Sequence, residues 1–137
     1  MVNIGNWIIC NRLAISYTKS FSMTMGRNIL NSSFNVHVNG NKLTQVSSVT
    51  YLGVKIDDSL SWTDHIHELE KKLSRACGVI YKLRHCVNIK CLRMFYYANV
   101  HCHLNYAILS YGSAPKRKLH KLNVIHNRIL RCIIQRV

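Results

Sequence analysis

The chain has 137 residues, of which 48% are hydrophobic, and it carries 19 Lys and Arg against 5 Asp and Glu, a net charge of +14. This length provides one domain, or one domain and part of another, and the apolar content argues against wholesale disorder. No run of about 20 apolar residues is present and the N-terminus lacks the basic start and apolar core of a secretory signal, so we expect neither a membrane span nor export.

The charge is unevenly distributed along the chain. All five acidic residues lie between Asp57 and Glu70, whereas residues 71–136 hold fourteen basic residues and no carboxylate. A basic segment without acids repels itself until a polyanion neutralises it, and nucleic acid is the commonest such partner. The segment therefore predicts contact with nucleic acid. The alternatives are a solvated basic surface or the basic half of an interface whose acidic half has been lost.

The N-terminal residues predict a short helix followed by a strand. Apolar side chains among polar ones indicate a helix over residues 4–15. Residues 20–27 alternate apolar with small or polar side chains, which is typical of a strand. That strand would place Met23 and Met25 together on the core side.

A hairpin is the next predicted element. Asn39-Gly40-Asn41 separates two alternating runs, residues 34–38 and 42–46. Asn-Gly between such runs is the strongest short-range hairpin signal, because both residues tolerate positive φ. Residues 49–56 then predict one further strand, so we expect a small antiparallel sheet.

Three helices are expected in the second half. Ser61-Trp62-Thr63-Asp64 fits a capping box, and the helix that follows has a core face at helical spacing formed by Ile66, Leu69, Leu73, Ala76, Ile80 and Leu83. A second helix is expected over 88–111, with its inward side chains at Leu92, Phe95, Tyr96, Leu104 and Ile108. After a break at 112–115, a third helix over 117–136 would use Leu122, Ile125, Ile129 and Ile133 as core.

These elements predict an α+β fold that is mostly α. It consists of an N-terminal helix, a small antiparallel sheet with a hairpin, and then a basic three-helix bundle. The boundary is expected between residues 58 and 59, which gives an N-terminal region 1–58 and a helical region 59–137.

The six cysteines show no disulfide-framework spacing. In a chain without a secretory signal they are expected to be reduced and mostly buried, in an intracellular, reducing compartment. His101-Cys102-His103 with Cys86 and Cys91 does not match the paired spacing of zinc modules. We therefore expect these side chains to be buried or partly buried structural residues and expect no metal site.

Several short motifs follow one another along the chain. The first is Trp7, Asn11, Leu13 and Ile15 with Thr18-Lys19-Ser20, the next is the Asn-Gly hairpin, and the third is Tyr51-Leu52-Gly53-Val54-Lys55-Ile56-Asp57. In this order they resemble the end of the palm in reverse transcriptases of non-LTR (LINE- and jockey-like) retrotransposons. The resemblance covers nearly the whole chain.

The resemblance implies roles for four residues. Lys19 matches a lysine proposed to donate a proton to the leaving pyrophosphate, and its alternative role is that of a solvated surface charge. Tyr51, Leu52 and Gly53 match the primer grip, which holds the primer 3′ end toward the active site. Glycine suits such a place because a backbone without Cβ can approach a ligand, and a bulge or tight packing is the alternative.

Downstream motifs resemble the polymerase thumb. Leu60-x-Trp62-x-x-His65-Ile66 resembles its entry, residues 119–131 resemble the end of the family's sequence, and Leu83-Arg84, Tyr97-Ala98 and 104–107 also agree. The thumb follows the template–primer backbone, which suits basic helices. Nucleic-acid contacts are therefore assigned to Lys71, Lys72, Arg75, Lys82, Arg117, Lys121, Arg128 and Arg131.

The chemistry of the family needs two metal ions held by paired carboxylates. In these polymerases the ions are Mg²⁺ and the carboxylates include a Phe/Tyr-x-Asp-Asp motif, which we expect to lie before residue 1. Asp57-Asp58 follows a strand and is expected to be a turn. We thus expect no catalytic residue, cofactor or polymerase activity in this chain alone.

The sequence thus predicts a truncated, catalytically incomplete reverse transcriptase, that is, part of an RNA-directed DNA polymerase. It would retain binding to an RNA–DNA hybrid or a single strand through its basic helices, with no small-molecule substrate and no membrane partner. The alternative is an inert structural remnant of a retrotransposon.

Overall fold

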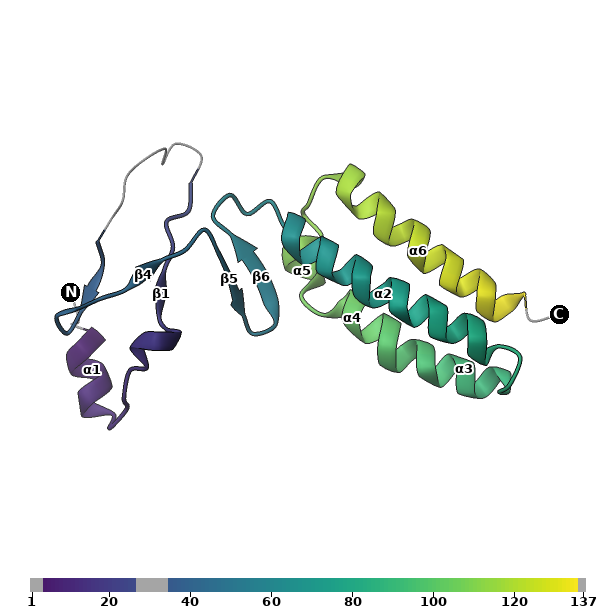
Figure 1. Cartoon of the computed structure of the whole chain (residues 1–137), viewed down its shortest axis with the longest axis horizontal. Helices are drawn as coiled ribbons and strands as arrows, with labels where there is room; N and C mark the ends of the chain where they lie inside the picture. The colour runs from purple at the N-terminus through teal and green to yellow at the C-terminus, as the bar shows by residue number, and fades with distance from the viewer. Residues whose placement is uncertain (1–3, 27–34, 136–137) are drawn as a thin grey trace. The chain divides into compact units, whose positions relative to one another are not determined.

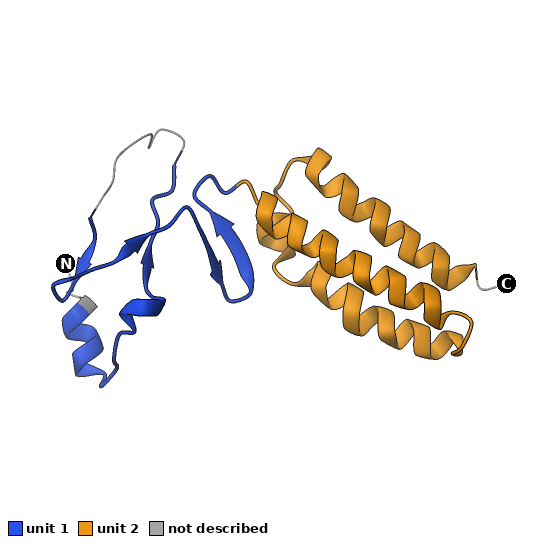
Figure 2. Ribbon diagram, viewed as in Figure 1, with its two compact units in different colours: residues 1–60 blue, residues 61–137 orange. Residues whose placement is uncertain are grey.

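The structure is a computed structural model that describes residues 4–26 and 35–135. The chain forms two compact units, Met1–Leu60 and Ser61–Val137 (Figure 2). The boundary lies two residues after the one drawn from the sequence. The fold is α+β and mostly α, which confirms the predicted class.

The N-terminal helix is shorter than predicted. α1 spans Ile4–Cys10, and a 3-10 turn η1 follows at Tyr17–Lys19. Arg12 adopts φ +54°, its N–H donates to the carbonyl of Ile9, and the N–H of Leu13 donates to that of Ile8. This pair of hydrogen bonds is a Schellman motif, which ends a helix by satisfying its last carbonyls. α1 therefore ends near the middle of the helix that was predicted over residues 4–15.

Two strand pairs follow in the N-terminal unit. β2 (His37–Val38) and β3 (Asn41–Lys42) pair antiparallel around Asn39-Gly40, both at positive φ, which confirms the predicted hairpin. β1 (Phe21–Ser22) instead pairs parallel with β4 (Thr44–Gln45). The expectation of an all-antiparallel sheet was therefore wrong. Parts of the predicted strands at 27 and 34 lie outside the described residues.

The predicted strand over 20–27 is confirmed only at its start. The chain is strand at Phe21–Ser22 and irregular through Met23 to Gly26. Met25 is 46% exposed and Met23 is half-buried, so the prediction that both are core residues was wrong for Met25. Alternation alone does not make a strand when no second strand lies alongside.

The predicted single strand over 49–56 is a hairpin. β5 (Ser48–Tyr51) pairs antiparallel with β6 (Val54–Asp57), and Tyr51 stands opposite Val54 (Figure 1). Leu52 and Gly53 form the turn at φ +48° and +79°. A two-residue loop with positive φ at both positions has the type I′ geometry that matches strand twist. Gly53 is therefore a turn glycine and not a bulge.

The helical unit starts with a long helix whose core face was predicted. α2 spans Thr63–Leu83, and the predicted inward residues are buried, with Leu83 half-buried at the end. The predicted capping box is not formed. The N-cap position is Trp62 at φ +59°, without a side-chain cap, and the hydroxyl of Ser61 accepts a weak bond from the N–H of Thr63 (3.4 Å).

The second predicted helix is divided into several pieces. α3 (Ile89–Tyr96), a π-helical stretch η2 (Tyr97–His101) and α4 (Cys102–Asn105) form one rod, capped by the side chain of Asn88. The rod ends at Tyr106, and Ala107 at φ +57° starts the short helix α5 (Ile108–Tyr111). Ile108 is consequently exposed, so its predicted inward position was wrong.

The last helix completes a three-helix bundle. α6 (Lys116–Ile134) buries Leu122, Ile129 and Ile133 as predicted, with Ile125 half-buried. Figure 1 shows α2 and α6 running in the same direction with the α3–α4 rod antiparallel to them. Tyr111 closes one end of the core, where its ring lies 5.3 Å from that of His65 and its hydroxyl donates to the carbonyl of Leu104.

The hydrophobic core lies entirely within the helical unit for the residues described. Its buried side chains come from α2, the rod, α5, the 112–115 turn and α6. Within residues 4–26 and 35–135, no helix combines the length and apolarity needed to cross a membrane.

Candidate nucleic-acid interface

The outer face of α2 carries three of the predicted contact residues. Lys71, Arg75 and Lys82 are exposed and lie opposite the buried face of the helix. Nε of Arg75 donates to the carbonyl of Lys71 (3.3 Å), which leaves the terminal guanidinium nitrogens directed outward. Lys72 differs, because its Nζ lies 3.3 Å from a carboxylate oxygen of Glu68. Its charge is therefore partly neutralised within α2.

α6 carries a second basic row. Arg117, Lys121 and Arg128 are separated by four and seven residues, so they share one side of the helix, and all three are exposed. The row is roughly 16 Å long at the rise of an α-helix. Arg131, also exposed, lies next to it. No acidic residue occurs in α6, so nothing on this helix neutralises the row.

α2 and α6 pack against each other in parallel. At their N-terminal ends, Nζ of Lys118 donates to the hydroxyl of Thr63 (2.6 Å) and to the carbonyl of Ser61 (3.0 Å). Further along, the helices enclose a groove of about 260 Å³ lined by Ser74, Cys77, Gly78, Tyr81, Ile125, Arg128 and Cys132. Of the predicted contact residues, Arg128 alone lines this groove. We call the seven exposed predicted contact residues of the two helices the basic face: Lys71, Arg75, Lys82, Arg117, Lys121, Arg128 and Arg131.

Gly78 keeps this groove open on the α2 side. A Cβ added there would meet no atom within 4 Å, so no packing within the fold explains the glycine. Glycine inside a helix costs about 1 kcal/mol relative to alanine. Its place is consistent with the close approach of another backbone to α2.

Tyr81 is a groove residue that the sequence did not assign, and Arg84 lies against its ring. The Arg84 guanidinium lies 4.6 Å from the ring centre of Tyr81, and Nε of Arg84 donates to Nε2 of His85 (2.9 Å). The Tyr81 ring is exposed beside Arg128. An aromatic ring next to basic side chains is what single-stranded nucleic acids stack on. The position of Tyr81 on α2, away from the core face, was the sequence signal that could have identified this residue.

A Tyr–His cluster lies on the other side of α6. The hydroxyl of Tyr96 hydrogen-bonds to Nε2 of His126 (2.7 Å), and their rings are stacked. Burial lowers the pKa of His126, and the nearby His101 lowers it further. The cluster borders a pocket of about 360 Å³ and the π-helical stretch η2. It was missed because the π-turn changes the helical spacing that places these residues.

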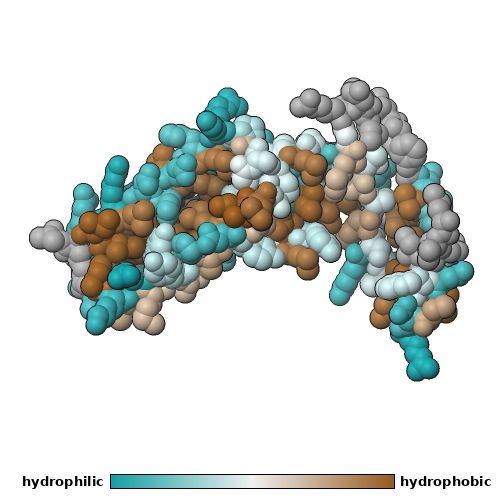
Figure 3. All heavy atoms as spheres, turned by 180° about the vertical axis from the view of Figure 1, so that it is seen from behind, coloured by the Kyte–Doolittle hydropathy of each residue, from teal (hydrophilic) through white to brown (hydrophobic). Residues whose placement is uncertain are grey.

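Hydrophobic side chains gather next to the C-terminal end of the bundle (Figure 3). There, a pocket of about 550 Å³ is lined by Ile89, Arg93, Tyr96, Tyr97, Leu130, Ile133 and Ile134. This end differs from the basic face, since Arg93 is its single charged lining residue.

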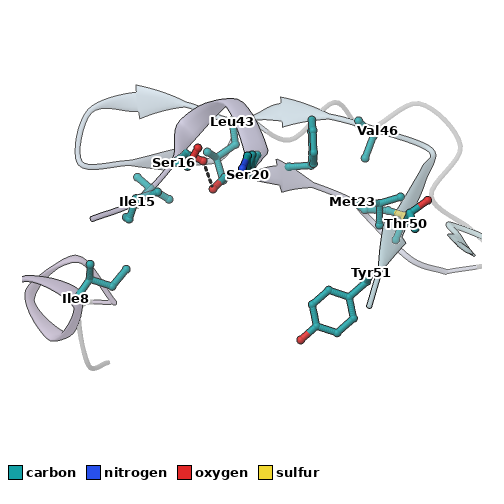
Figure 4. A pocket seen from close by; sticks show the side chains of 13 residues that line it. Ile8, Ile15, Ser16, Ser20, Met23, Leu43, Val46, Thr50 and Tyr51 are labelled. Carbon is teal, nitrogen blue, oxygen red and sulfur yellow. Dashed lines mark hydrogen bonds between the residues drawn. The ribbon is translucent and has the colours of Figure 1, made fainter. Parts of the chain in front are cut away.

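The N-terminal unit brings two predicted site residues to one pocket. Lys19 and Tyr51 both line a depression of about 650 Å³, whose other lining residues are mostly apolar. Figure 4 shows Ser16 and Ser20, joined by a hydrogen bond from the Ser20 hydroxyl to the Ser16 carbonyl (2.9 Å), on one side of it, and Tyr51 apart from them. Leu52 and Gly53 are not part of the lining. They form the tip of the β5–β6 hairpin, where Tyr51 is 62% and Leu52 71% exposed.

Of the acidic pair Asp57-Asp58, only Asp58 is a turn residue. Asp57 is the last residue of β6 and pairs with Ser48, so its predicted turn position was wrong. The Ser59 hydroxyl donates to Oδ2 of Asp57 (2.6 Å), and the N–H of Leu60 donates to the Asp57 carbonyl. Both bonds are local and support the turn that follows β6.

The cysteines depart from expectation. Cys10, Cys86, Cys91 and Cys102 are exposed, Cys132 is half-buried and only Cys77 is buried, so the prediction of mostly buried thiols was wrong. Cys10, Cys91 and Cys102 lie on helices but outside the core, and Cys86 lies in the turn after α2. His101 and His103 are half-buried as predicted. Within the part of the chain that the structure describes, no three His, Cys, Asp or Glu side chains gather as metal ligands.

Comparisons with known proteins return no relative of this chain. No family model, no curated protein and no solved structure matches it.

Proposed function

We propose that this chain corresponds to the palm end and thumb of a reverse transcriptase of the non-LTR retrotransposon type, and that it binds nucleic acid. The observation that carries the proposal is the basic face, in which two parallel helices each present an exposed row of lysine and arginine. The motif resemblance adds the polymerase context. The proposal assigns this chain the holding of template and primer, and does not assign it nucleotidyl transfer.

The chemistry of the basic face suits a phosphate backbone. Arg117, Lys121 and Arg128 offer cations over roughly 16 Å, and α6 supplies no carboxylate to compete for them. The exposed ring of Tyr81 adds a surface for base stacking beside Arg128. Such a site reads no sequence. It predicts affinity that depends strongly on salt and little on base composition.

The experiment is a salt titration of binding to a fluorescently labelled RNA–DNA hybrid with a single-stranded end. Fluorescence anisotropy between about 50 and 200 mM salt gives the slope of log K against log[salt]. For the variant Arg117→Gln/Lys121→Gln/Arg128→Gln, we expect the slope to fall in magnitude by about 2, because three phosphate contacts are lost.

The matched control removes the same charge from other exposed positions. Lys90, Arg93 and Lys116 are exposed and do not line the α2–α6 groove. The variant Lys90→Gln/Arg93→Gln/Lys116→Gln should keep most of the slope. Equal losses in both variants would show that binding has no defined face, and absence of binding at low salt would refute the proposal.

An inert structural remnant is the second candidate function, and one observation favours it. The N-terminal unit exposes large apolar side chains such as Trp7, Ile9 and Leu13. Surfaces of this kind usually pack against another part of a fold. Light scattering and thermal melting of the chain separate the candidates. A monodisperse monomer with a cooperative melt contradicts the remnant, whereas aggregates without a melt support it.

A further inference from the structure

Two thiols face each other across the groove between α2 and α6. Cys77 and Cys132 both line that groove, one from each helix, and Cys132 is near enough to raise the pKa of Cys77. The helix register agrees with this proximity. Thr63 and Lys118 are joined by a hydrogen bond, and Cys77 and Cys132 each lie the same number of residues further along. Parallel helices in register keep both pairs adjacent.

The two thiols differ in their access to solvent. Cys77 is buried, with 8% of its surface exposed, whereas Cys132 is half-buried at the mouth of the groove. Because Cys132 is the more exposed of the two, a small molecule that enters the groove reaches Cys132 before it reaches Cys77.

We propose that Cys77 and Cys132 are a dithiol site that forms a reversible disulfide by exchange with a small-molecule disulfide, for which oxidised glutathione serves as the probe. A disulfide needs two cysteines whose side chains lie close together, and Cys77 and Cys132 enter one groove from two neighbouring helices. The bond would join α2 to α6, and the inference does not rest on the proposed nucleic-acid binding.

The exchange takes place in two balanced steps. The Cys132 thiolate attacks one sulfur of the small disulfide, which forms a mixed disulfide and releases one thiolate. The Cys77 thiolate then attacks the Cys132 sulfur, which forms the Cys77–Cys132 bond and releases the second thiolate. Two protein thiols are oxidised and one small disulfide is reduced to two thiols.

The surroundings support this order of events. Burial raises the pKa of Cys77, and Arg128 at the groove lowers it in part. Cys77 is therefore a poor first nucleophile in bulk solvent but is held beside the mixed disulfide once Cys132 has reacted. Because Cys77 lies close to the Cys132 sulfur, it can attack that sulfur even when only a small fraction of Cys77 is thiolate.

The test uses the full chain with its exposed cysteines, Cys10, Cys86, Cys91 and Cys102, changed to serine. The protein is incubated at low concentration with oxidised glutathione, and the products are mapped by mass spectrometry of tryptic peptides. We expect a peptide pair joined through Cys77 and Cys132, the loss of two hydrogen atoms from the intact mass, and reversal by a thiol reductant. Closure of the long loop should raise Tm by about 10 °C or more.

Single variants provide the controls. In this background Cys77→Ser should stop at a mixed disulfide on Cys132, and Cys132→Ser should react slowly or not at all. If the serine background does not fold, the same mapping is performed on the unaltered chain, where Cys77–Cys132 should dominate over all other pairings. Stable mixed disulfides without the internal bond, or preferential pairing of Cys77 or Cys132 with another cysteine, would overturn the proposal.

Discussion

At the scale of single residues, the buried His65 and the half-buried His126 connect the packing of the bundle to pH. Burial lowers the pKa of His65, with Glu68 opposing and Lys72 adding to that change. Burial also lowers the pKa of His126, which hydrogen-bonds to Tyr96. Both rings are therefore held preferentially in the neutral form, on opposite sides of the bundle core.

This arrangement predicts that the helical unit loses stability in acid. A histidine whose folded pKa lies below its ordinary value of 6.5 binds fewer protons in the folded chain than in the unfolded chain. The free energy of unfolding is then highest above pH 6.5 and decreases as the pH falls from 6.5 through the folded pKa. Urea denaturation followed by circular dichroism between pH 8 and about 5.5 measures this dependence.

The variant His126→Gln tests the source of the effect. Glutamine keeps a hydrogen-bonding group near the Tyr96 hydroxyl but does not titrate, so the decrease in stability with falling pH should become shallower. His65 remains and retains the rest of the dependence. The control His120→Gln changes an exposed histidine of the same helix and should leave the pH profile as it was. Identical profiles for the chain and His126→Gln would contradict this explanation.

At the scale of secondary-structure elements, the β5–β6 hairpin contains a strained turn. Leu52 adopts φ +48°, a region that costs a β-carbon-bearing residue about 1 kcal/mol, whereas Gly53 at +79° tolerates its conformation. We predict that Leu52→Asn stabilises the hairpin by about 1 kcal/mol, because Asn-Gly is the preferred type I′ pair. Amide hydrogen exchange of the β5 and β6 N–H groups should slow about fivefold.

The matched variant changes the neighbouring turn position. Gly53→Ala introduces a Cβ at positive φ and should accelerate exchange of the same amides. The two substitutions thus act in opposite directions on one turn. Faster exchange in Leu52→Asn would mean that the Leu52 side chain has a stabilising contact that outweighs its backbone strain.

The sequence predicted the elements whose pattern is local and missed those set by tertiary structure. α2 and α6 follow a periodic apolar face, and the Asn39-Gly40 hairpin has its own turn chemistry, so all three were predictable. Leucine is not a residue type that favours turns, so Leu52 concealed the β5–β6 hairpin inside an apparent strand. Ala107 at positive φ likewise gives no signal of a helix break. Backbone strain at such residues is imposed by the surrounding fold.

The candidate interface was predictable only in part. The exposed positions of Lys71, Lys82, Arg117 and Arg128 follow from helical spacing on α2 and α6. The groove between them does not, because the sequence of each helix contains no information on whether its partner runs parallel or antiparallel. The Lys118 hydrogen bonds at the start of α2 reveal that orientation. The same packing places Cys77 opposite Cys132.

At the scale of the whole molecule, the two units differ in how they can be stabilised. Every buried hydrophobic side chain described in the structure lies between Ile66 and Ile133, in the helical unit. The described part of the N-terminal unit exposes Trp7, Ile9 and Leu13 and has strands of only two to four residues. Short hairpins without a packed apolar face are marginally stable in water. The free energy of folding therefore arises mainly from residues 61–137.

This difference predicts that the two units behave differently when separated. The isolated segment 61–137 should unfold in one cooperative urea transition, with a midpoint equal to that of the helical signal in the full chain, since it retains the whole core. The isolated segment 1–60 should show no cooperative transition, because it has too little buried apolar surface to offset its chain entropy. Circular dichroism and tryptophan fluorescence report both segments, with Trp62 in one and Trp7 in the other. A large decrease in the midpoint for 61–137 would show that residues 1–60 contribute to the stability of the bundle.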